Sequence, residues 1–476
     1  MSELVVVGGG PAGMAAALAA SAAGVSVTLL DAAPRLGGQI YRQPLRDADG
    51  SGAAIGPHLP ARFAALRDAG VELLTGRLVW AVSPVPGGYE LFLATPEGAG
   101  AGRLVAPALV LATGASELVL PFRGWELPGV TTAGAAQALL KHEGVLLGRR
   151  VVVAGSGPFL LPVAAALVRG GAHVAAVVEA GDPLRRPQAL ARLGAAPRVV
   201  RDALSYLAVL AGARVPLLRG AAVTAAVGGE RVEAVVVSRL DAQWRPRPDG
   251  ERRYLVDAAC VSFGFVPRLE LARQLGLSDH TAPGRPGAAA RHDGGVTGLA
   301  GVFVAGELTG IGGAHLAELE GERAGAAAAR YLGHGAPERA RHGALARAGR
   351  VAAGLAALYP LAPGWLEWSD QETVVCRCED VTVGALRRAL AGGARSVREL
   401  RSVTRCGMGY CQGRTCGPIA QLLVAAATGR ATALVGDLHL RPVATPVALG
   451  ALGAPDAAPA DERDADPAAA GPSTVV

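Results

Sequence analysis

The sequence is poor in lysine, in aromatic residues and in long apolar runs. Lysine occurs once, at Lys141, and aromatic residues make up only 4% of the 476 residues. The net charge is +6, but the arginines are scattered and not interleaved with aromatic side chains, so nucleic-acid binding is not expected. Gly, Pro or charge interrupts each apolar stretch before membrane-spanning length, and no secretory signal is recognisable. We therefore expect a cytoplasmic protein without a transmembrane segment.

Cysteine is almost absent from the first three quarters of the chain. Cys260 stands alone there, and the other five cysteines lie within residues 376–416. In a cytosolic protein such a group indicates metal binding rather than disulfides. The chain is also too long for one hydrophobic core, which predicts two or three domains. Its abundant glycine and alanine suit an α/β protein with tight turns and close helix–strand contacts.

The first forty residues carry a glycine loop between two apolar runs. Residues 4–7 predict a buried parallel strand, and the loop that follows reads Gly8-x-Gly10-x-x-Gly13 before an alanine-rich helix. These glycines allow a tight turn, a close approach to a pyrophosphate and the packing of the helix on the strand. A second strand is predicted at 25–30, and it ends at Asp31, whose carboxylate would accept hydrogen bonds from a ribose. The unit predicts a bound dinucleotide.

Further features of the sequence favour FAD over NAD in this unit. The stretch Arg35-Leu-Gly-Gly-Gln39 places small residues and an amide just beyond Asp31. The pair Gly306-Glu307 comes at the end of a late strand predicted at 299–306, with a helix predicted from about Gly313. Together with the N-terminal position of the unit, these features predict FAD.

The same supersecondary unit occurs a second time. A strand opening at Val151 leads into Gly155-x-Gly157, and a strand predicted at 173–178 ends at Glu179. The third glycine position holds Leu160, whose side chain is expected to push the helix away from the strand. Two interpretations stay open: a site for NAD(P)H, or a unit kept for architecture or for another adenine nucleotide. The bulky leucine favours the second.

The five clustered cysteines lie among predicted short helices. Cys376-x-Cys378 is followed by Cys406 and by Cys411-x4-Cys416. Ser396-Val-Arg-Glu399 predicts a capping box, and Gly417-Pro418 predicts a helix start where the Cys416 thiolate would be stabilised. Thiolates on loops between small helices suit an iron–sulfur cluster or zinc. A flavin in the same chain favours iron–sulfur, because a flavin can pass single electrons and zinc cannot.

Four stretches resemble the two-dinucleotide-domain flavoprotein disulfide-reductase superfamily: Gly8–Gly13, Gly37-Gly-Gln39, Ala112-Thr-Gly114 and Val302–Glu307. The resemblance implies an α/β fold with two Rossmann-like dinucleotide-binding domains, in which Glu307 would bond the ribityl chain of the flavin. The members that reduce disulfides carry a Cys-x-x-Cys beside the flavin, and this chain has none before residue 376, so disulfide reduction is not expected.

The candidate nucleotide-binding residues form two sets. Those assigned to FAD are Gly8, Gly10, Pro11, Ala12, Gly13, Asp31, Arg35, Gly38, Gln39, Val79, Ala112, Thr113, Gly114, Gly306, Glu307 and Ala314. Those assigned to a second nucleotide, NAD(H) or another adenine nucleotide, are Gly155, Gly157 and Glu179. No residue is identified as a catalytic acid or base.

The cysteine module resembles the bacterioferritin-associated-ferredoxin-like [2Fe-2S] domain in Val375–Glu379 and in Arg405–Cys416. The resemblance implies a small, mostly helical domain. A [2Fe-2S] cluster takes four thiolates, and five are present. The predicted ligands are Cys376, Cys378, Cys411 and Cys416, with Cys406 as the spare, because look-alike domains can carry Ala at its position.

The order of these modules resembles the α-subunit family of heteromeric flavin amine and amino-acid dehydrogenases, which includes opine oxidase, hydrogen cyanide synthase and D-hydroxyproline or proline dehydrogenase. It implies a flavin-containing β-subunit that oxidises a C–N bond and an electron-relay role for this chain. A further candidate partner is a small ferredoxin-like γ-subunit. Two alternatives stay open. One is a stand-alone NADH-dependent flavin reductase that passes electrons out through its cluster, and the other is a scaffold without redox activity.

The domain organisation follows from these assignments. We expect an FAD-binding domain at 1–125 and 296–335, a second dinucleotide domain at 126–295, a connector at 336–372, the [2Fe-2S] domain at 373–430, and a C-terminal extension at 431–476 that is disordered from about 451.

Overall fold

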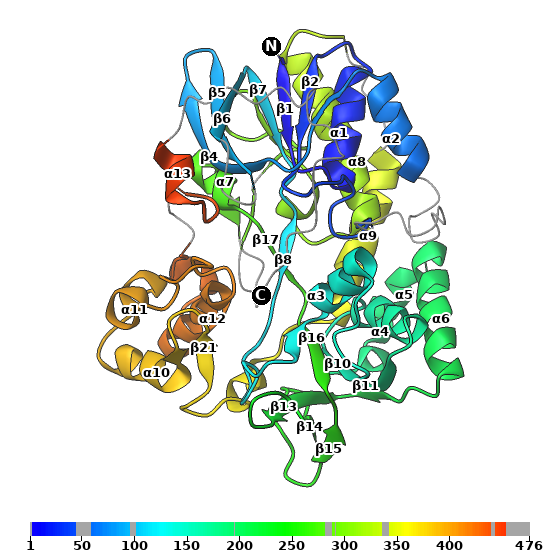
Figure 1. The fold of residues 1–476 in the computed structure, drawn as a ribbon, viewed down its shortest axis with the longest axis vertical. Coiled ribbons are helices and arrows are strands. Elements are labelled where there is room, and N and C mark those ends of the chain that lie inside the picture. Colours follow the sequence, from blue (N-terminus) through cyan, green and yellow to red (C-terminus); the bar gives the residue numbers. More distant parts are fainter. Residues whose placement is uncertain are drawn as a thin grey trace, which may run out of the picture.

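The chain folds around two parallel sheets of five strands each (Figure 1). The computed structural model describes residues 2–43, 59–95, 101–194, 196–280, 288–290, 292–335, 342–438 and 443–453. The first sheet has the order β20-β7-β1-β2-β3, with every neighbouring pair parallel. Its strands are β1 (Leu4–Val7), β2 (Val27–Leu30), β3 (Glu72–Leu74), β7 (Ala108–Leu111) and β20 (Val302–Val304). Most of these are continuous buried apolar runs, as expected of strands covered on both faces.

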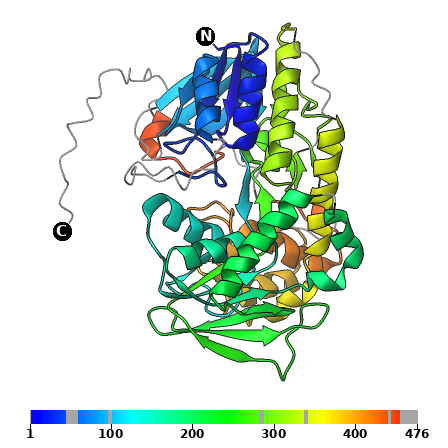
Figure 2. The ribbon, with the colours of Figure 1, turned by 90° about the vertical axis from the view of Figure 1, so that its right-hand side faces the viewer.

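Helices cover one face of this sheet, and a small antiparallel sheet adjoins the other. The helices are α1 (Pro11–Ser21), α2 (Leu59–Asp68) and α8 (Ala314–Tyr331), and the small sheet holds β4 (Leu78–Val85), β5 (Gly88–Ala94) and β6 (Ala101–Ala106). Figures 1 and 2 show α8 lying alongside α1. Their backbones approach closely at Gly321 and Gly325, which have no side chain. A Cβ on Gly321 would lie 2.1 Å from the carbonyl oxygen of Ala12, and a Cβ on Gly325 would lie 2.1 Å from that of Ala16.

The second sheet has the order β12-β11-β10-β16-β9 and is also parallel. Its strands are β9 (Val130–Thr132), β10 (Arg150–Gly155), β11 (His173–Glu179), β12 (Leu217–Arg219) and β16 (Ala258–Ser262). An antiparallel meander, β13 (Ala221–Val227), β14 (Ala234–Arg239) and β15 (Arg252–Leu255), packs beside it. The helical segments are α3 (Ala133–Ala138), the π-helix η1 (Leu139–Glu143), α4 (Leu160–Arg169), η2 (Pro183–Arg185), α5 (Pro187–Leu193) and α6 (Pro197–Gly212).

Two antiparallel strands join the two Rossmann-like parts. They are β8 (Ala115–Glu117) and β17 (Phe265–Pro267), which run between the parts in Figure 1. The chain therefore leaves the first part and returns to it through neighbouring strands. Short elements follow β17, namely α7 (Glu270–Gln274), β18 (Asp279–His280) and β19 (Ala289–Ala290). Although α7 falls within the range expected for the second dinucleotide domain, Leu271 and Ala272 pack in the core of the first Rossmann-like part, so α7 is part of that unit.

The C-terminal third begins with a connector and ends in a small helical module. The connector holds α9 (His342–Leu358), which contacts both α8 and α5, and η4 (Pro363–Glu367). The module holds β21 (Val374–Cys376), β22 (Val381–Thr382), α10 (Val383–Ala391), α11 (Val397–Thr404) and α12 (Cys416–Thr428), and η5 (Thr432–Leu434) follows it. The last helix, α13 (Leu449–Gly453), lies away from the module, beside β4 and α7 in Figure 1. The side chains of Thr382 and Ser396 cap α10 and α11, so the cap predicted at Ser396 is confirmed.

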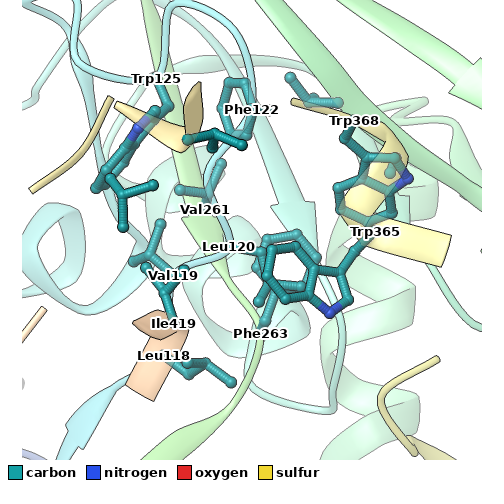
Figure 3. Close-up of a cluster of buried hydrophobic side chains, with 14 of the residues drawn as sticks. Leu118, Val119, Leu120, Phe122, Trp125, Val261, Phe263, Trp365, Trp368 and Ile419 are labelled. Atoms are coloured by element: carbon teal, nitrogen blue, oxygen red, sulfur yellow. The ribbon is translucent and has the colours of Figure 1, made fainter. Parts of the chain in front are cut away.

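The module shares a hydrophobic core with the second Rossmann-like part. Leu118, Phe122 and Trp125 from the chain after β8 pack in one buried cluster with Trp365 and Ile419 (Figure 3). The indole Nε1 of Trp125 also donates to the carbonyl oxygen of Val374, at 2.6 Å. The module is thus built into the protein rather than tethered by a linker.

Two predicted elements differ from those observed. The strand predicted at 25–30 is observed as Val27–Leu30, and that predicted at 299–306 covers only Val302–Val304. Gly301 and Gly306 flank the shorter strand, and their φ values of +75° and +77° are incompatible with an extended strand. Most of the tail predicted to be disordered lies outside the described residues, but residues 451–453 belong to α13. Among the helices described, none combines the length and the apolar character needed to cross a membrane.

Candidate functional site

The first glycine loop is sterically restricted to glycine at two positions. Gly8 has a φ of +108°, and a Cβ there would lie 2.3 Å from the carbonyl oxygen of Ala112. A Cβ on Gly13 would lie 1.7 Å from the carbonyl oxygen of Gly8. Helix α1 begins at Pro11 after Gly10, with no side-chain cap, so its first N–H groups are free to bind an anion. The loop has the geometry of a pyrophosphate-binding turn.

Asp31 is held at the end of β2 by backbone donors on both sides. Its Oδ2 accepts from Gly9 N at 2.6 Å, and its Oδ1 accepts from Ala33 N at 2.7 Å. Burial raises the pKa of this carboxyl, while the two backbone hydrogen bonds oppose the shift. Each oxygen retains a further lone pair, so Asp31 can accept two ribose hydroxyls as predicted for a dinucleotide site.

The N-terminus of α8 lies close to that of α1. Gly306 begins the short helix η3 (Gly306–Leu308), and a Cβ on it would lie 2.7 Å from the Ala12 Cβ. The Glu307 carboxylate accepts a hydrogen bond from the backbone N–H of Gly313, and burial raises its pKa. Helix α8 starts immediately afterwards, at Ala314. Two helix N-termini and two carboxylates, from Asp31 and Glu307, therefore surround one region.

The residues of this region fit an FAD. Gly114, Gly310 and Gly313 have positive φ values, and a Cβ on any of them would meet no atom within 4 Å, so they border an open cradle. The Thr113 hydroxyl donates to the carbonyl oxygen of Arg268 at 2.8 Å, which fixes the strand end beside Gly114. When bound here, FAD would be held by the glycine loop, by Asp31 and by the N-terminus of α8.

The remaining FAD candidates occupy different environments. Gly38 has a φ of +60° and faces the glycine loop, since a Cβ on it would lie 3.0 Å from the Gly10 Cα. Gln39 is exposed, and its Oε1 accepts from Arg42 at 2.6 Å. Val79 is buried in the core of the first Rossmann-like part, and Arg35 is half-buried. Their contacts with FAD stay predictions.

Glu320 is part of this site although it was not among the candidate residues of the sequence. Its Oε2 accepts from Gly306 N and from the Thr309 hydroxyl, both at 2.9 Å, and burial raises its pKa. The carboxylate thus holds the turn that carries Glu307. Glu320 follows Ala317 by three residues on α8, and a Cβ on Gly306 would lie 3.5 Å from the Ala317 Cβ, so the helical spacing is a sequence signal that places both side chains on one face.

In the second glycine loop the acidic residue is placed as in the first loop, but the helix begins later. The Glu179 oxygens accept from Gly157 N and Gly181 N, both at 2.9 Å, and burial raises the pKa of Glu179 to about 7. Helix α4 begins only at Leu160, whereas α1 begins at the position that corresponds to Pro158. The buried Leu160 side chain therefore accompanies a helix start two residues farther from the glycines. Nucleotide binding by this unit stays a prediction.

Three cysteines form a buried group in the C-terminal module. The sulfurs of Cys376, Cys406 and Cys416 all lie within 4.8 Å of one another. Cys378 is exposed and shares hydrogen bonds with Cys411, which is partly buried. The structure does not set Cys406 apart as a spare, because its side chain is buried and its sulfur belongs to this group. Which four of the five bind a cluster stays a prediction.

The ionisation states of these three thiols depend on one another. Hydrogen bonds from Cys406 and Cys416 lower the pKa of Cys376 to about 2, and the hydrogen bond with Cys376, together with burial, raises the pKa of Cys406 to about 12. The pKa of Cys416 is also raised, by its hydrogen bonds with Cys376 and Cys406 and by burial. The thiolate stabilisation predicted at this helix start is thus outweighed. Only a bound cation would let the buried thiols ionise together, which fits an iron–sulfur cluster.

Two family models match the chain. One is the pyridine nucleotide-disulphide oxidoreductase model, over residues 2–321, and the other is the BFD-like [2Fe-2S] binding domain, over residues 374–426. The first implies FAD and covers the glycine loops, and the second covers the five clustered cysteines.

Curated relatives match almost the whole chain. The opine oxidase subunit designated A, from Agrobacterium tumefaciens (strain Ach5), is 36% identical, over 94% of this chain and 91% of that protein. Hydrogen cyanide synthase subunit HcnB from Pseudomonas aeruginosa is 33% identical, over 90% of this chain and 93% of that protein. The sarcosine oxidase α-subunit from Corynebacterium sp. (strain P-1) is 31% identical, over 95% of this chain but only 45% of that protein.

A solved structure with a similar fold is that of L-proline dehydrogenase from P. horikoshii. It gives a TM-score of 0.68 and covers 95% of this chain and 79% of that one, at 20% sequence identity. This likeness supports the fold of two Rossmann-like parts with an additional small module.

Proposed function

The chain belongs to the pyridine nucleotide-disulphide oxidoreductase family, in the group of the opine oxidase and hydrogen cyanide synthase subunits named above, and from this premise we propose that it relays electrons in a heteromeric dehydrogenase. The chain is an FAD-dependent oxidoreductase with a C-terminal [2Fe-2S] domain. In the proposal, a flavin-containing partner chain oxidises the C–N bond of an amino acid, an opine or an amine, and a small ferredoxin-like chain is a further candidate partner. The named relatives are subunits, which supports a partner chain.

One observation carries the relay role: the cysteine module is built into the flavoprotein body. Trp125 and Ile419, which lie in one buried cluster, come from the segment after β8 and from α12. A cluster held there keeps a fixed position relative to the FAD cradle. When bound, FAD can take two electrons and release them singly, which matches it to a one-electron iron–sulfur cluster.

The side chains around the cradle support the same role. Glu307 and Glu320 are buried and hydrogen-bonded to backbone groups, so they fix the cradle rather than offer a free base. His315, which follows the first residue of α8, is exposed. This environment suits electron transfer better than proton abstraction from a substrate.

The proposal is tested with the anaerobically purified chain, alone and co-expressed with a flavin oxidoreductase encoded beside it. We expect no amino acid, opine or amine to bleach the flavin of the isolated chain, and the complex to be bleached by its substrate. Dithionite reduction should give the EPR signal of a [2Fe-2S] cluster. The signal should disappear in Cys416→Ser and persist in Cys260→Ser, because Cys260 is buried in the core of the second Rossmann-like part. Substrate-dependent bleaching of the isolated chain would contradict the relay role.

A second candidate function is an NADH-dependent reductase that passes electrons out through its cluster. The pre-positioned Glu179 favours it, since a carboxylate at this place suits the ribose of NADH and repels the 2′-phosphate of NADPH. The displaced start of α4 argues against it. Stopped-flow mixing with NADH separates the two, because only the reductase should show fast flavin bleaching.

A further inference from the structure

We propose that Arg414 and Glu270 are a positioning pair that fixes the cluster-binding loop against the FAD-binding part and thereby sets the rate of electron exchange. The inference rests on the relay function proposed above. Arg414 lies between Cys411 and Cys416, while Glu270 is the first residue of α7, more than 140 residues earlier in the chain.

The contact between them is short and mostly shielded from solvent. Arg414 Nε lies 3.0 Å from Glu270 Oε1, with side chains 18% and 13% exposed. The same guanidinium donates to the carbonyl oxygens of Cys411 and Ala444. One side chain therefore ties the cysteine loop to α7 and to the C-terminal segment. Such a planar, multiply bonded cation restricts geometry more than a single lysine contact would.

From Glu270 the contacts continue to the FAD cradle. Arg268, two residues before it, donates its backbone N–H to the carbonyl oxygen of Gly114 at 3.0 Å, and its own carbonyl oxygen accepts from the Thr113 hydroxyl at 2.8 Å. Thr113 and Gly114 are predicted FAD contacts. Covalent and hydrogen bonds therefore lead without a gap from Cys411 to the edge of the cradle.

Helix α7 has a second link to the chain beyond the cysteines. Arg273 pairs with Asp437 at 2.8 Å and with Asp279 at 2.9 Å, and its side chain is only 8% exposed. The backbone N–H of Ala444 donates to the carbonyl oxygen of Trp80 in β4 at 2.7 Å. The FAD-binding part is thus joined to both the cysteine loop and the segment that follows the module.

The other cysteine pair is anchored on a different surface. Arg377, between Cys376 and Cys378, lies over the Trp125 ring at 3.8 Å and donates to the Trp125 carbonyl oxygen. Trp125 belongs to the shared hydrophobic core, so this anchor fixes the module as a whole. The Arg414–Glu270 pair is the contact that sets how the second cysteine loop faces the flavin.

Because the module as a whole is anchored elsewhere, we expect variants of the Arg414–Glu270 pair to fold. Removing Arg414 leaves the shared core and the Arg377–Trp125 contact in place, so the module should stay docked while its second loop shifts. Electron transfer slows steeply as the separation of two redox centres grows. A small displacement of this loop should therefore change the exchange rate more than it changes stability.

The test uses the full chain carrying FAD and cluster, kept anaerobic. Rapid photoreduction injects single electrons, and absorbance follows their redistribution between flavin and cluster. We expect Arg414→Gln and Glu270→Gln to keep wild-type FAD and iron contents but to exchange electrons roughly 10- to 100-fold more slowly. The double variant should be no slower than either single one, because the two residues act as a unit. Arg414→Lys, which retains the charge, should restore part of the rate.

Arg245→Gln is the matched control. Arg245 pairs with Glu367 at the same 3.0 Å, but away from the cysteines and with both side chains more than half exposed. It should exchange electrons at the wild-type rate. If Arg414→Gln lost iron, Glu270→Gln, which lies outside the cysteine loop, would decide the outcome. A wild-type rate in Glu270→Gln overturns the positioning role alone. An absence of exchange in the loaded wild-type chain overturns the relay function and the positioning role together.

Discussion

Asp31 and Glu179 hold equivalent positions in the two Rossmann-like parts, and the structure separates them by burial. Both accept two backbone hydrogen bonds at the end of the second strand of their unit. Burial raises the pKa of Glu179 to about 7 and also raises that of Asp31, and the backbone donors oppose both shifts. Only Asp31 has an arginine nearby, Arg42, whose charge further opposes the rise. A carboxyl that is partly neutral at physiological pH is a weaker acceptor than a carboxylate for ribose hydroxyls.

The raised pKa of Glu179 makes stability depend on pH in a defined window. The Glu179 carboxyl would lose its proton near pH 4.5 in the unfolded chain and near pH 7 in the folded chain. Its contribution to the free energy of unfolding is therefore fully present below pH 4.5 and is lost as the pH rises to about 7. The upper bound of this contribution to stability is about 3 kcal/mol. We expect the melting temperature of Glu179→Gln, relative to wild type, to rise between pH 5 and pH 7.5 and then level off. Glu230→Gln, at an exposed position, should give no such trend. A pH-independent difference for Glu179→Gln would contradict the assignment.

At the residue scale, the sequence predicted the groups whose role is local. Gly8, Gly13 and Asp31 act within one strand–loop–helix unit, and the spacing along the chain fixes their relation. Arg414 could not be predicted in this way, because its partner Glu270 is brought near only by the complete fold. Cys406 is a similar case, since its side chain is buried and its sulfur joins those of Cys376 and Cys416 only in the folded chain.

At the scale of elements, the contact of α1 with α8 decides whether the FAD cradle closes. Gly321 and Gly325 face Ala12 and Ala16 on the same side of α8, one turn apart. The two helices can pack closely only while both positions lack a side chain. This contact brings the two helix N-termini to one place, and a sequence prediction of two separate helices does not reveal it.

Replacing Gly325 with alanine should therefore be costly although alanine favours helices. Intrinsic propensity alone would stabilise the helix by about 1 kcal/mol. The added Cβ would lie 2.1 Å from the Ala16 carbonyl oxygen, so α8 must move, at a cost of roughly 1–3 kcal/mol. We expect Gly325→Ala to lower the melting temperature and the bound FAD. Gly349→Ala in α9, where a Cβ meets nothing within 4 Å, should be neutral or stabilising. Equal behaviour of the two variants would show that the close packing is not required.

The positions of the principal strands and helices were largely predictable from the sequence. The buried strands β1, β10 and β11 followed from short apolar runs next to glycines, and the cap of α11 followed from Ser396. The strand predicted at 299–306 was too long, because the conformations of Gly301 and Gly306 are not encoded by hydrophobicity.

At the scale of the whole molecule, the shared core unites the cysteine module and the second Rossmann-like part in a single structural unit. Trp125, Trp244, Trp365 and Trp368, four of the five tryptophans, lie in this core. Trp244 and Trp368 are stacked with their ring centroids 5.9 Å apart. The sequence predicted a separate domain at 373–430, and its docking on the core could not be foreseen from local patterns.

Loss of the cluster should consequently weaken more than the module. Without iron, the thiols of Cys376, Cys406 and Cys416 cannot ionise together, and the binding free energy that contributes to folding is lost. We expect protein from iron-depleted cells to melt several degrees lower by tryptophan fluorescence, since about 1 kcal/mol corresponds to roughly 2–4 °C for domains of 150–250 residues. Reconstitution with iron and sulfide should restore the transition. An unchanged tryptophan transition would show that the module folds independently of the core.

The split of the FAD-binding part between the two ends of its sequence has a consequence for synthesis. Strand β20 and helix α8 leave the ribosome roughly 190 residues after Gly114, about 10–40 s later at ~5–20 residues per second. Until then the nascent chain carries a complete glycine loop but no Gly306, no Glu307 and no helix to cover Ala12 and Ala16. FAD binding is thus a late event in the synthesis of this protein, and a chain that stops before residue 302 should be released without its cofactor.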